Sequence, residues 1–193
     1  MLIVKHGAFG ALAANNFLIT DEETGESALV DCSSDGADMR QFIGSAGLKY
    51  ILLTHGHFDH CDGVPEIARV YGAEIVIAEG DRHMAADTAA NVSALFGSRW
   101  KVYTPGRTVS DGDVLLLGKT EIAVMATPGH TPGSVCYYTD DCLFTGDTIM
   151  VGGVGRTDFP GGSEAVLMES LEKLLPYTRT RSVYPGHGQI VVR

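Results

Sequence analysis

The amino-acid sequence predicts an α/β fold in which mixed β-sheets lie inside and helices lie outside. Short apolar runs typical of strands recur along the whole chain, and apolar residues with helical spacing fall between some of them. The 24 glycines among 193 residues follow no fixed period, and they indicate many tight turns between short elements. Because no linker or low-complexity tract interrupts the pattern, we expect a single domain that spans residues 1–193.

Apolar runs bounded by Gly, Asp, Asn or Thr are the predicted strands. Most of them are four to seven residues long, and they suit a pleated surface that is half buried. In chain order they cover residues 2–4, 17–20, 27–32, 50–54, 73–78, 114–117, 121–127, 134–138, 142–147 and 182–186.

Segments between these runs are predicted to be helical because their apolar residues recur on one helix face. They cover residues 35–47, 62–72, 81–97 and 162–176. In the last segment, Ser163 is placed to cap the first turn, and Pro176 is expected to follow the end of the helix. Its core-facing stripe is expected to consist of Val166, Leu167, Ser170, Leu171 and Leu174.

The composition argues against several classes of partner. The chain has 14 basic and 24 acidic residues and no cluster of Lys or Arg, so nucleic acid is not an expected partner. No window of about 18 uninterrupted apolar residues is present, so no membrane span is expected. The cysteines Cys32, Cys61, Cys136 and Cys142 have no paired spacing, which indicates reduced thiols and a cytoplasmic protein.

The segment 52–63, LLTHGHFDHCDG, places potential metal ligands directly after the apolar run 50–54. His55 and His57 are two residues apart, so in an extended chain they lie on the same side. Asp59 and His60 are expected in the turn that follows. Imidazole and carboxylate are the ligands that zinc, iron and manganese prefer.

Three further potential ligands also follow apolar runs. His130 comes after the run 121–127, Asp147 ends the run 142–147, and His187 follows the last run. Because ligands in α/β sheets collect outside the carboxyl ends of strands, we expect all of these side chains to meet at one edge. Seven such ligands exceed the needs of one tetrahedral ion and favour two metals that share a bridging carboxylate.

Four motifs resemble those of the metallo-β-lactamase superfamily: HGHFDH (55–60), PGHT (128–131), TGD (145–147) and PGHG (185–188). The stretch GDTIMVGGVGRTDFPGG (146–162) is similar to the glyoxalase II and persulfide dioxygenase branch. The resemblance implies a four-layer αββα sandwich of two mixed sheets with outer helices. It implies no C-terminal helical domain for glutathione, since the chain ends shortly after the last motif.

The resemblance also assigns the ligands. The first metal is implied to bind His55, His57 and His130, the second Asp59, His60 and His187, with Asp147 as the bridge. Zinc is the first choice for both positions; iron and manganese are alternatives, and a single bound metal is also open. Asp147 stands where the best-known zinc β-lactamases use cysteine, which argues against an antibiotic-degrading role.

The implied activity is hydrolysis of a small-molecule thioester, S-lactoylglutathione or a related acyl thioester. Metal-bound hydroxide would attack the carbonyl, with Asp59 orienting the water and Asp147 bridging the metals. Arg156 is the candidate for substrate binding. The alternative is a mononuclear non-haem iron persulfide dioxygenase that uses His55, His130 and Asp147. The oligomeric state stays open, with a homodimer as one option.

The substrate pocket is expected to be built from residues 6–16 and 80–100, with Met84, Phe96 and Trp100 as candidate lining residues. The remaining histidines, His6 and His83, are expected to be non-ligands. The thiol of Cys61 is expected to be a small buried hydrophobe rather than a ligand, although it follows His60 directly.

Overall fold

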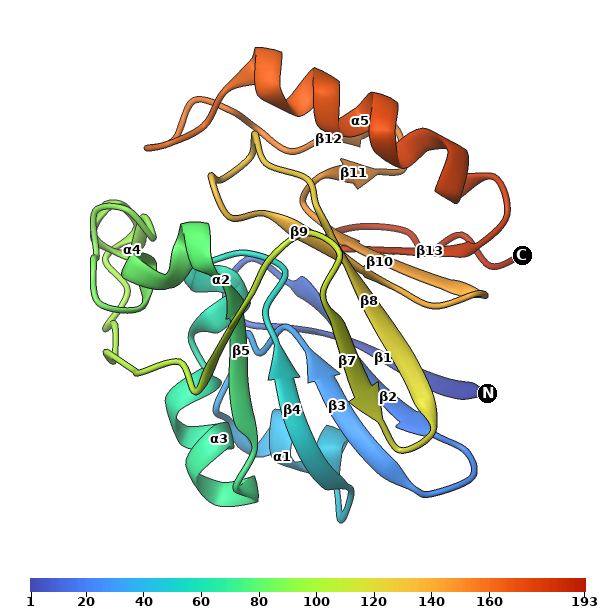
Figure 1. The fold of residues 1–193 in the computed structure, drawn as a ribbon. Coiled ribbons are helices and arrows are strands. Elements are labelled where there is room, and N and C mark those ends of the chain that lie inside the picture. Colours follow the sequence, from blue (N-terminus) through green and yellow to red (C-terminus); the bar gives the residue numbers. More distant parts are fainter.

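The computed structural model describes residues 1–193 as two β-sheets packed face to face, each covered by helices on its outer side (Figure 1). The first sheet contains, in spatial order, β1 (Leu2–Phe9), β2 (Ala14–Asp21), β3 (Glu26–Val30), β4 (Gly47–Leu52), β5 (Glu74–Ala78) and β6 (Arg107–Val109). The second contains β13 (Ser182–Pro185), β10 (Cys142–Gly146), β9 (Val135–Tyr138), β8 (Thr120–Ala126) and β7 (Val114–Leu117). A hairpin of β11 (Ile149–Met150) and β12 (Gly153–Val154) stands apart from both sheets.

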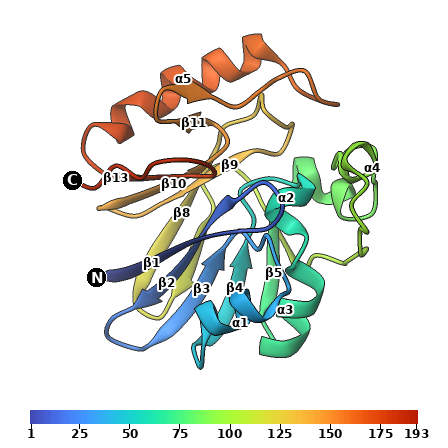
Figure 2. The same ribbon diagram turned by 180° about the vertical axis from the view of Figure 1, so that it is seen from behind.

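The helices form the two outer layers. They are α1 (Ala37–Ile43), α2 (Phe58–Cys61), α3 (Val64–Tyr71), the 3₁₀ helix η1 (Glu79–Ala85), α4 (Ser93–Phe96) and α5 (Glu164–Thr178). Helices α1 and α3 lie on the outer face of the first sheet, and α5 lies on the outer face of the second, in both views (Figures 1 and 2). The predicted αββα sandwich is therefore confirmed. None of the helices combines the length and the apolar character that crossing a membrane requires.

Alternation along the strands of the first sheet serves two cores at once. Val30 and Leu52 face the second sheet, whereas their neighbours Leu29 and Ile51 face α1 and α3. Strands that are buried on both faces read as continuous apolar runs, which is why the sequence marked β3, β4 and β5 so clearly.

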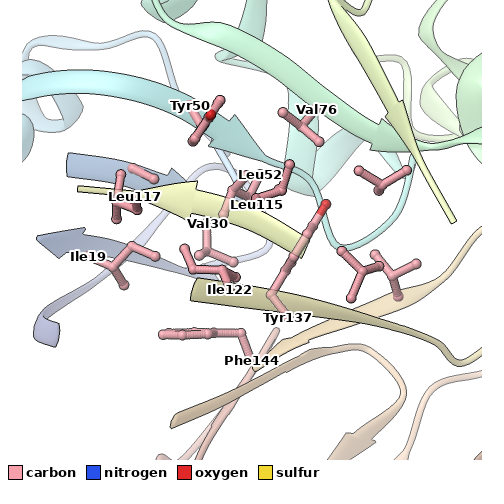
Figure 3. Packing of buried hydrophobic residues seen from close by; sticks show 14 of the residues in the cluster. Ile19, Val30, Tyr50, Leu52, Val76, Leu115, Leu117, Ile122, Tyr137 and Phe144 are labelled. Carbon is pink, nitrogen blue, oxygen red and sulfur yellow. The ribbon is translucent and has the colours of Figure 1, made fainter. Parts of the chain in front are cut away.

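Side chains from both sheets interlock between them. Figure 3 shows Val30 and Leu52 of the first sheet with Leu115, Ile122 and Tyr137 of the second, all of them buried. The hydroxyl of fully buried Tyr137 donates to the carbonyl of Leu53 at 3.0 Å. This bond satisfies a polar group in the core and ties the second sheet to the chain just after β4.

The predicted helix over 81–97 is wrong as a single element. The chain forms η1, then turns, and only Ser93–Phe96 is α-helical. The Asp87 carboxylate accepts the backbone N–H groups of Ala89 and Ala90 at 2.9 and 3.0 Å, a side-chain turn that competes with helix. Val92 then has φ +58°, outside the right-handed helical region.

Helix α5 continues to Thr178 and contains Pro176 instead of ending before it. A proline lacks the N–H that would bond to the carbonyl of Glu172, but both residues are exposed in the last turn, so water can replace that bond. The predicted cap is confirmed, since the Ser163 hydroxyl accepts the N–H of Val166 at 3.4 Å. Strands β6, β11 and β12 were not predicted because they are only two or three residues long.

Candidate metal centre

Potential ligands from the first motif lie at the carboxyl end of β4. His55 and His57 follow the strand, but the chain bends at Thr54 and His55 instead of staying extended as expected, and the two rings are 4.9 Å apart between centroids. Asp59 and His60 lie on the short helix α2 and not in the predicted turn. The helix turns their side chains back toward the strand ends, and all of these residues are buried.

The other predicted ligands come from the second sheet. His130 follows β8, Asp147 follows β10 directly, and His187 follows β13. Strand β10 pairs in parallel with β13, so Asp147 and His187 leave the same edge of that sheet. Gly186 allows the close approach, because a Cβ there would lie 2.1 Å from Asp147 Oδ1 and 2.8 Å from the ring of His60.

The side chains gather into three groups whose ligand atoms lie within 4.8 Å of one another: His55 with His57 and His130, His55 with His60 and Asp147, and Asp59 with His60 and His187. The first and third groups coincide with the two predicted ligand sets. Asp147 lies between them. Its Oδ1 is 3.5 Å from His60 Nε2, and its Oδ2 is 3.6 Å from His130 Nε2 and 3.8 Å from His187 Nε2.

Hydrogen bonds to fixed acceptors determine where the imidazole protons sit. His130 Nδ1 lies 2.7 Å from the carbonyl oxygen of Arg156, which can only accept, so Nδ1 carries the proton. His60 Nδ1 donates in the same way to Asp31 Oδ2 at 2.8 Å. In the neutral form of either ring the lone pair would therefore be on Nε2, and that atom faces the cluster.

His55 is held in the same tautomer, with its proton on Nδ1, through Thr54 and Asp31. The hydroxyl of Thr54 donates to Asp31 at 2.9 Å, which leaves its oxygen free to accept from His55 Nδ1 at 3.1 Å. His55 Nε2 is consequently unprotonated, and it is buried without any hydrogen-bond partner. Asp147 Oδ1 is buried without a partner as well. Since buried polar atoms are rarely left unpaired, these two acceptors fit a bound cation.

The electrostatics of the cluster also fit divalent cations. Burial lowers the pKa of His55 well below its ordinary value and that of His57 to about 3, so both rings are neutral ligands at neutral pH. Burial also opposes a charge on His60, but the carboxylates of Asp59 and Asp147 outweigh it and raise its pKa to about 10. The cluster therefore has a negative field that attracts positive charge.

The buried Asp31 was missed as a functional residue, although it was included in a predicted strand. It stands directly after β3 with φ +58°, and it accepts both the N–H and the hydroxyl of Thr54 as well as His60 Nδ1. The signal was available, because Asp31 follows an apolar run just as Asp147 does.

The carboxylate of Asp81, which was not predicted to be functional either, links the loop of His55 and His57 to the loop of His130. It is fully buried and accepts the N–H of Gly56 at 2.8 Å, the N–H of Gly133 at 2.6 Å and the hydroxyl of Thr131 at 2.7 Å. Gly56 lies between the first two histidines, and Thr131 follows His130. No sequence signal marks this role, since Asp81 lies in η1, inside the segment predicted as an ordinary helix.

A pocket of about 210 Å³ opens beside the cluster, and its lining includes His57, Asp59, His130, Asp147 and His187. Arg156 lines it as predicted, but its guanidinium is held by Asp158 with two 2.6 Å bonds. Among the predicted pocket residues Phe96 contributes to the wall, as does Leu12 from the 6–16 loop.

Two predicted pocket residues lie elsewhere. Met84 is buried against Gly56, and Trp100 packs on the outer core and donates to the carbonyl of Ala85. Of the histidines predicted to be non-ligands, His6 bonds to Asn15 Oδ1 at 2.8 Å, and His83 lies beside a separate surface pocket. The Cys61 thiol donates to the carbonyl of His55 at 3.4 Å, and burial raises its pKa well above the ordinary value.

Comparison with known proteins places these motifs in a family context. A family model described as the metallo-beta-lactamase superfamily matches residues 9–187. Probable metallo-hydrolase YqgX of Bacillus subtilis is 34% identical over 186 residues, which cover 93% of this chain and 87% of that protein. Hydroxyacylglutathione hydrolase GloC of Haemophilus influenzae is 31% identical and covers 92% and 87%, respectively.

Solved structures show the same fold. The B3 metallo-beta-lactamase BLEG-1 superposes with a TM-score of 0.90 at 30% identity, over 97% of this chain and 93% of that chain. TTHA1623, solved in a di-iron-bound form, superposes with a TM-score of 0.86 at 28% identity, over 98% and 94%.

Proposed function

The chain belongs to the metallo-beta-lactamase superfamily, and we propose that within it the protein is a glyoxalase II-like hydrolase of acyl thioesters. Superfamily membership and its hydrolase relatives support metal-dependent hydrolysis. One observation carries the proposal. The carboxylate of Asp147 lies 3.5 to 3.8 Å from imidazole nitrogens of both predicted ligand sets, so it could supply an oxygen to a cation held by each set.

Two divalent cations, held by the predicted ligand sets, would supply Lewis acidity that makes water nucleophilic at neutral pH and polarises an acyl carbonyl. Zinc is the proposed metal, and iron is supported by the di-iron form of TTHA1623. Other residues of the chain keep the ligand nitrogens free to bind these cations. Thr54, Asp31 and the carbonyl of Arg156 hold protons away from the cluster, so the ligand nitrogens keep their lone pairs.

Asp59 is the proposed residue that orients the attacking water. It lines the pocket, and its Oδ2 lies 3.2 Å from His187 Nε2. Burial alone would raise the pKa of Asp59, but His60 and His187 lower it below its ordinary value, so the carboxylate is ready to accept a hydrogen bond from water.

The proposed reaction needs no separate general acid. A C–O bond forms between water and the acyl carbon, and the C–S bond breaks with its electron pair staying on sulfur. Because a thiol has a pKa of about 8.5, sulfur departs as thiolate without prior protonation. The products are a carboxylate and a thiolate, with the two protons of the water released to solvent.

The test is a substrate panel on protein loaded with zinc, iron or manganese, together with its metal content. We expect two metals per chain and hydrolysis of S-lactoylglutathione or other acyl thioesters. A β-lactam such as nitrocefin belongs in the panel because BLEG-1 is a B3 metallo-beta-lactamase. Two bound metals with turnover of the β-lactam and of no thioester would contradict the proposal.

A second candidate, the mononuclear iron persulfide dioxygenase, is supported by another feature of the same site. His130 Nε2 lies 3.6 Å from Asp147 Oδ2, and the rings of His55 and His130 are 4.8 Å apart, which offers two imidazoles and one carboxylate to a single iron. Oxygen uptake with glutathione persulfide at one iron per chain, without thioester hydrolysis, would replace the first candidate by this one.

A further inference from the structure

The pocket has an apolar wall beside the ligand cluster. This wall is formed by Leu12, Phe58, Val92, Phe96, Met150 and Phe159. These residues come from the β1–β2 turn, α2, α4, β11 and the loop before α5, so distant parts of the chain build one surface.

Three aromatic rings give this wall a continuous face. The ring of Phe96 lies 5.1 Å from that of Phe58 and 6.3 Å from that of Phe159 between centroids. Phe159 in turn meets His57 edge-on at 5.6 Å, so the aromatic surface reaches the ligand cluster. Phe96 is 46% exposed, which leaves part of its ring free to contact a ligand.

The backbone before α4 is strained in a way that supports a role in binding. Val92 has φ +58°, a conformation that β-branched residues rarely adopt. Its carbonyl accepts the N–H groups of Leu95 and Phe96, so the strained residue starts the turn that carries Phe96. Strained residues of this kind cluster at ligand-binding segments.

No free positive charge accompanies the wall. Apart from the imidazoles, Arg156 is the one basic side chain that lines the pocket. Asp158 neutralises it through two 2.6 Å bonds, and the guanidinium lies 3.9 Å from the centre of the Phe159 ring. The carboxylates of a thiol carrier such as glutathione would therefore have to compete with Asp158 for this guanidinium.

The pocket is too small to hold both the acyl group and the thiol carrier of a thioester. Its volume of about 210 Å³ is below the roughly 300–1,000 Å³ of pockets that enclose a whole ligand, so it holds only one of these two parts. A polar carrier laid against the apolar wall would lose its hydrogen bonds to water. Resting on the thioester hydrolysis proposed above, we infer that the pocket binds apolar alkyl or aryl acyl groups. The thiol carrier stays in solvent, so the protein discriminates little between different carriers.

Two substrate series on the metal-loaded protein test this inference. In the first, acetyl, butyryl, hexanoyl, phenylacetyl and lactoyl groups are carried on N-acetylcysteamine. We expect kcat/KM to rise about fourfold for each methylene until the pocket is filled. In the second, one acyl group is carried on N-acetylcysteamine, glutathione and coenzyme A, and kcat/KM should vary by less than about tenfold. Preference for lactoyl over every apolar acyl group, or for glutathione by about a hundredfold, would overturn the inference.

Adjacent residues of α4 provide a matched pair of variants. Phe96→Ala should lower kcat/KM about tenfold for the hexanoyl and phenylacetyl substrates and less than about threefold for acetyl. Leu95→Ala removes a side chain that is 71% exposed and does not line the pocket, so it should leave the whole series unchanged. Equal losses for all acyl groups in Phe96→Ala would contradict the assignment of the wall.

Calorimetry of carboxylate binding tests the assignment of the pocket separately from the proposed thioester hydrolysis. Hexanoate and phenylacetate should bind the zinc-loaded protein at least about tenfold more tightly than acetate does, whether or not any thioester turns over. Absence of turnover with this preference intact would refute the proposed function and keep the pocket assignment. Turnover without the preference would keep the function and refute the inference.

Discussion

Residues outside the ligand set determine whether the ligands can act. Asp31 is 1% exposed, accepts a hydrogen bond from His60 Nδ1, and is linked to His55 Nδ1 through the hydroxyl of Thr54. It thereby sets the lone pairs of two imidazoles that belong to different predicted ligand sets. Groups that support metal ligands in this way affect affinity almost as strongly as the ligands do.

Replacing Asp31 by Ala is expected to weaken metal binding about 10- to 100-fold. The change leaves His60 Nδ1 and the Thr54 hydroxyl without their acceptor. The rings of His60 and His55 can then rotate, or can carry their proton on Nε2 instead of Nδ1. Competition with a chromophoric chelator measures the affinity. Asp38→Ala, at an exposed position of α1, is the control and should bind metal normally. An unchanged affinity in folded Asp31→Ala protein would show that the relay is dispensable.

The second buried carboxylate, Asp81, acts on stability. Asp81→Ala leaves the buried N–H groups of Gly56 and Gly133 unpaired and is expected to lower the free energy of unfolding by about 3 kcal/mol or more. The Thr131 hydroxyl loses the same acceptor but can still donate to Ser134, 2.7 Å away. Urea unfolding measures this loss. Asp87→Ala removes a carboxylate that also accepts two backbone N–H groups, but at the surface, so its effect should be far smaller. Equal effects of the two changes would refute the assigned role.

At the scale of elements, α5 packs on the second sheet through one of its faces. Leu174 is fully buried against Met125, Cys136 and Leu143 on the outer side of the second sheet. This stripe was predictable because a 15-residue helix repeats its period several times, so the pattern outweighs any single residue.

Leu174→Ala is expected to lower the free energy of unfolding by about 2–5 kcal/mol, through lost burial and the cavity left behind. The adjacent Leu175→Ala removes a side chain that is 45% exposed and should change it by less than about 0.5 kcal/mol. Chemical denaturation of the metal-free forms compares the two. Similar losses would mean that α5 does not pack through the stripe seen here.

The segment 79–96 shows where element prediction fails. Its alanines favour helix, but the side-chain turn at Asp87 and the left-handed Val92 divide it. Such turns are local and could be suspected from Asp followed by small residues. The conformation of Val92 could not, since valine intrinsically avoids it and the surrounding packing has to impose it.

At the scale of the whole molecule, the cluster joins both sheets, so metal binding should stabilise the entire fold. Metal present at about 100 times its dissociation constant should add about 2.7 kcal/mol to the free energy of unfolding, if the unfolded chain does not bind it. Thermal unfolding before and after EDTA treatment, with re-addition of zinc, measures the shift. A metal-free protein that unfolds at the same temperature would argue that the cluster does not bind metal strongly.

The sequence by itself determined an α/β fold with mixed sheets and the residues that could meet, because buried strands read as apolar runs and the ligands follow them directly. The four-layer αββα arrangement came from the resemblance of its motifs to the superfamily. Only the tertiary structure decided how these residues meet. The position of Asp147 between two ligand groups depends on the packing of one sheet on the other, as do the proton relay through Thr54 and the bonds of Asp81. The apolar pocket wall, with Arg156 neutralised by Asp158, likewise assembles loops far apart in the chain. Such contacts depend on distances in space, which the order of residues along the chain does not specify.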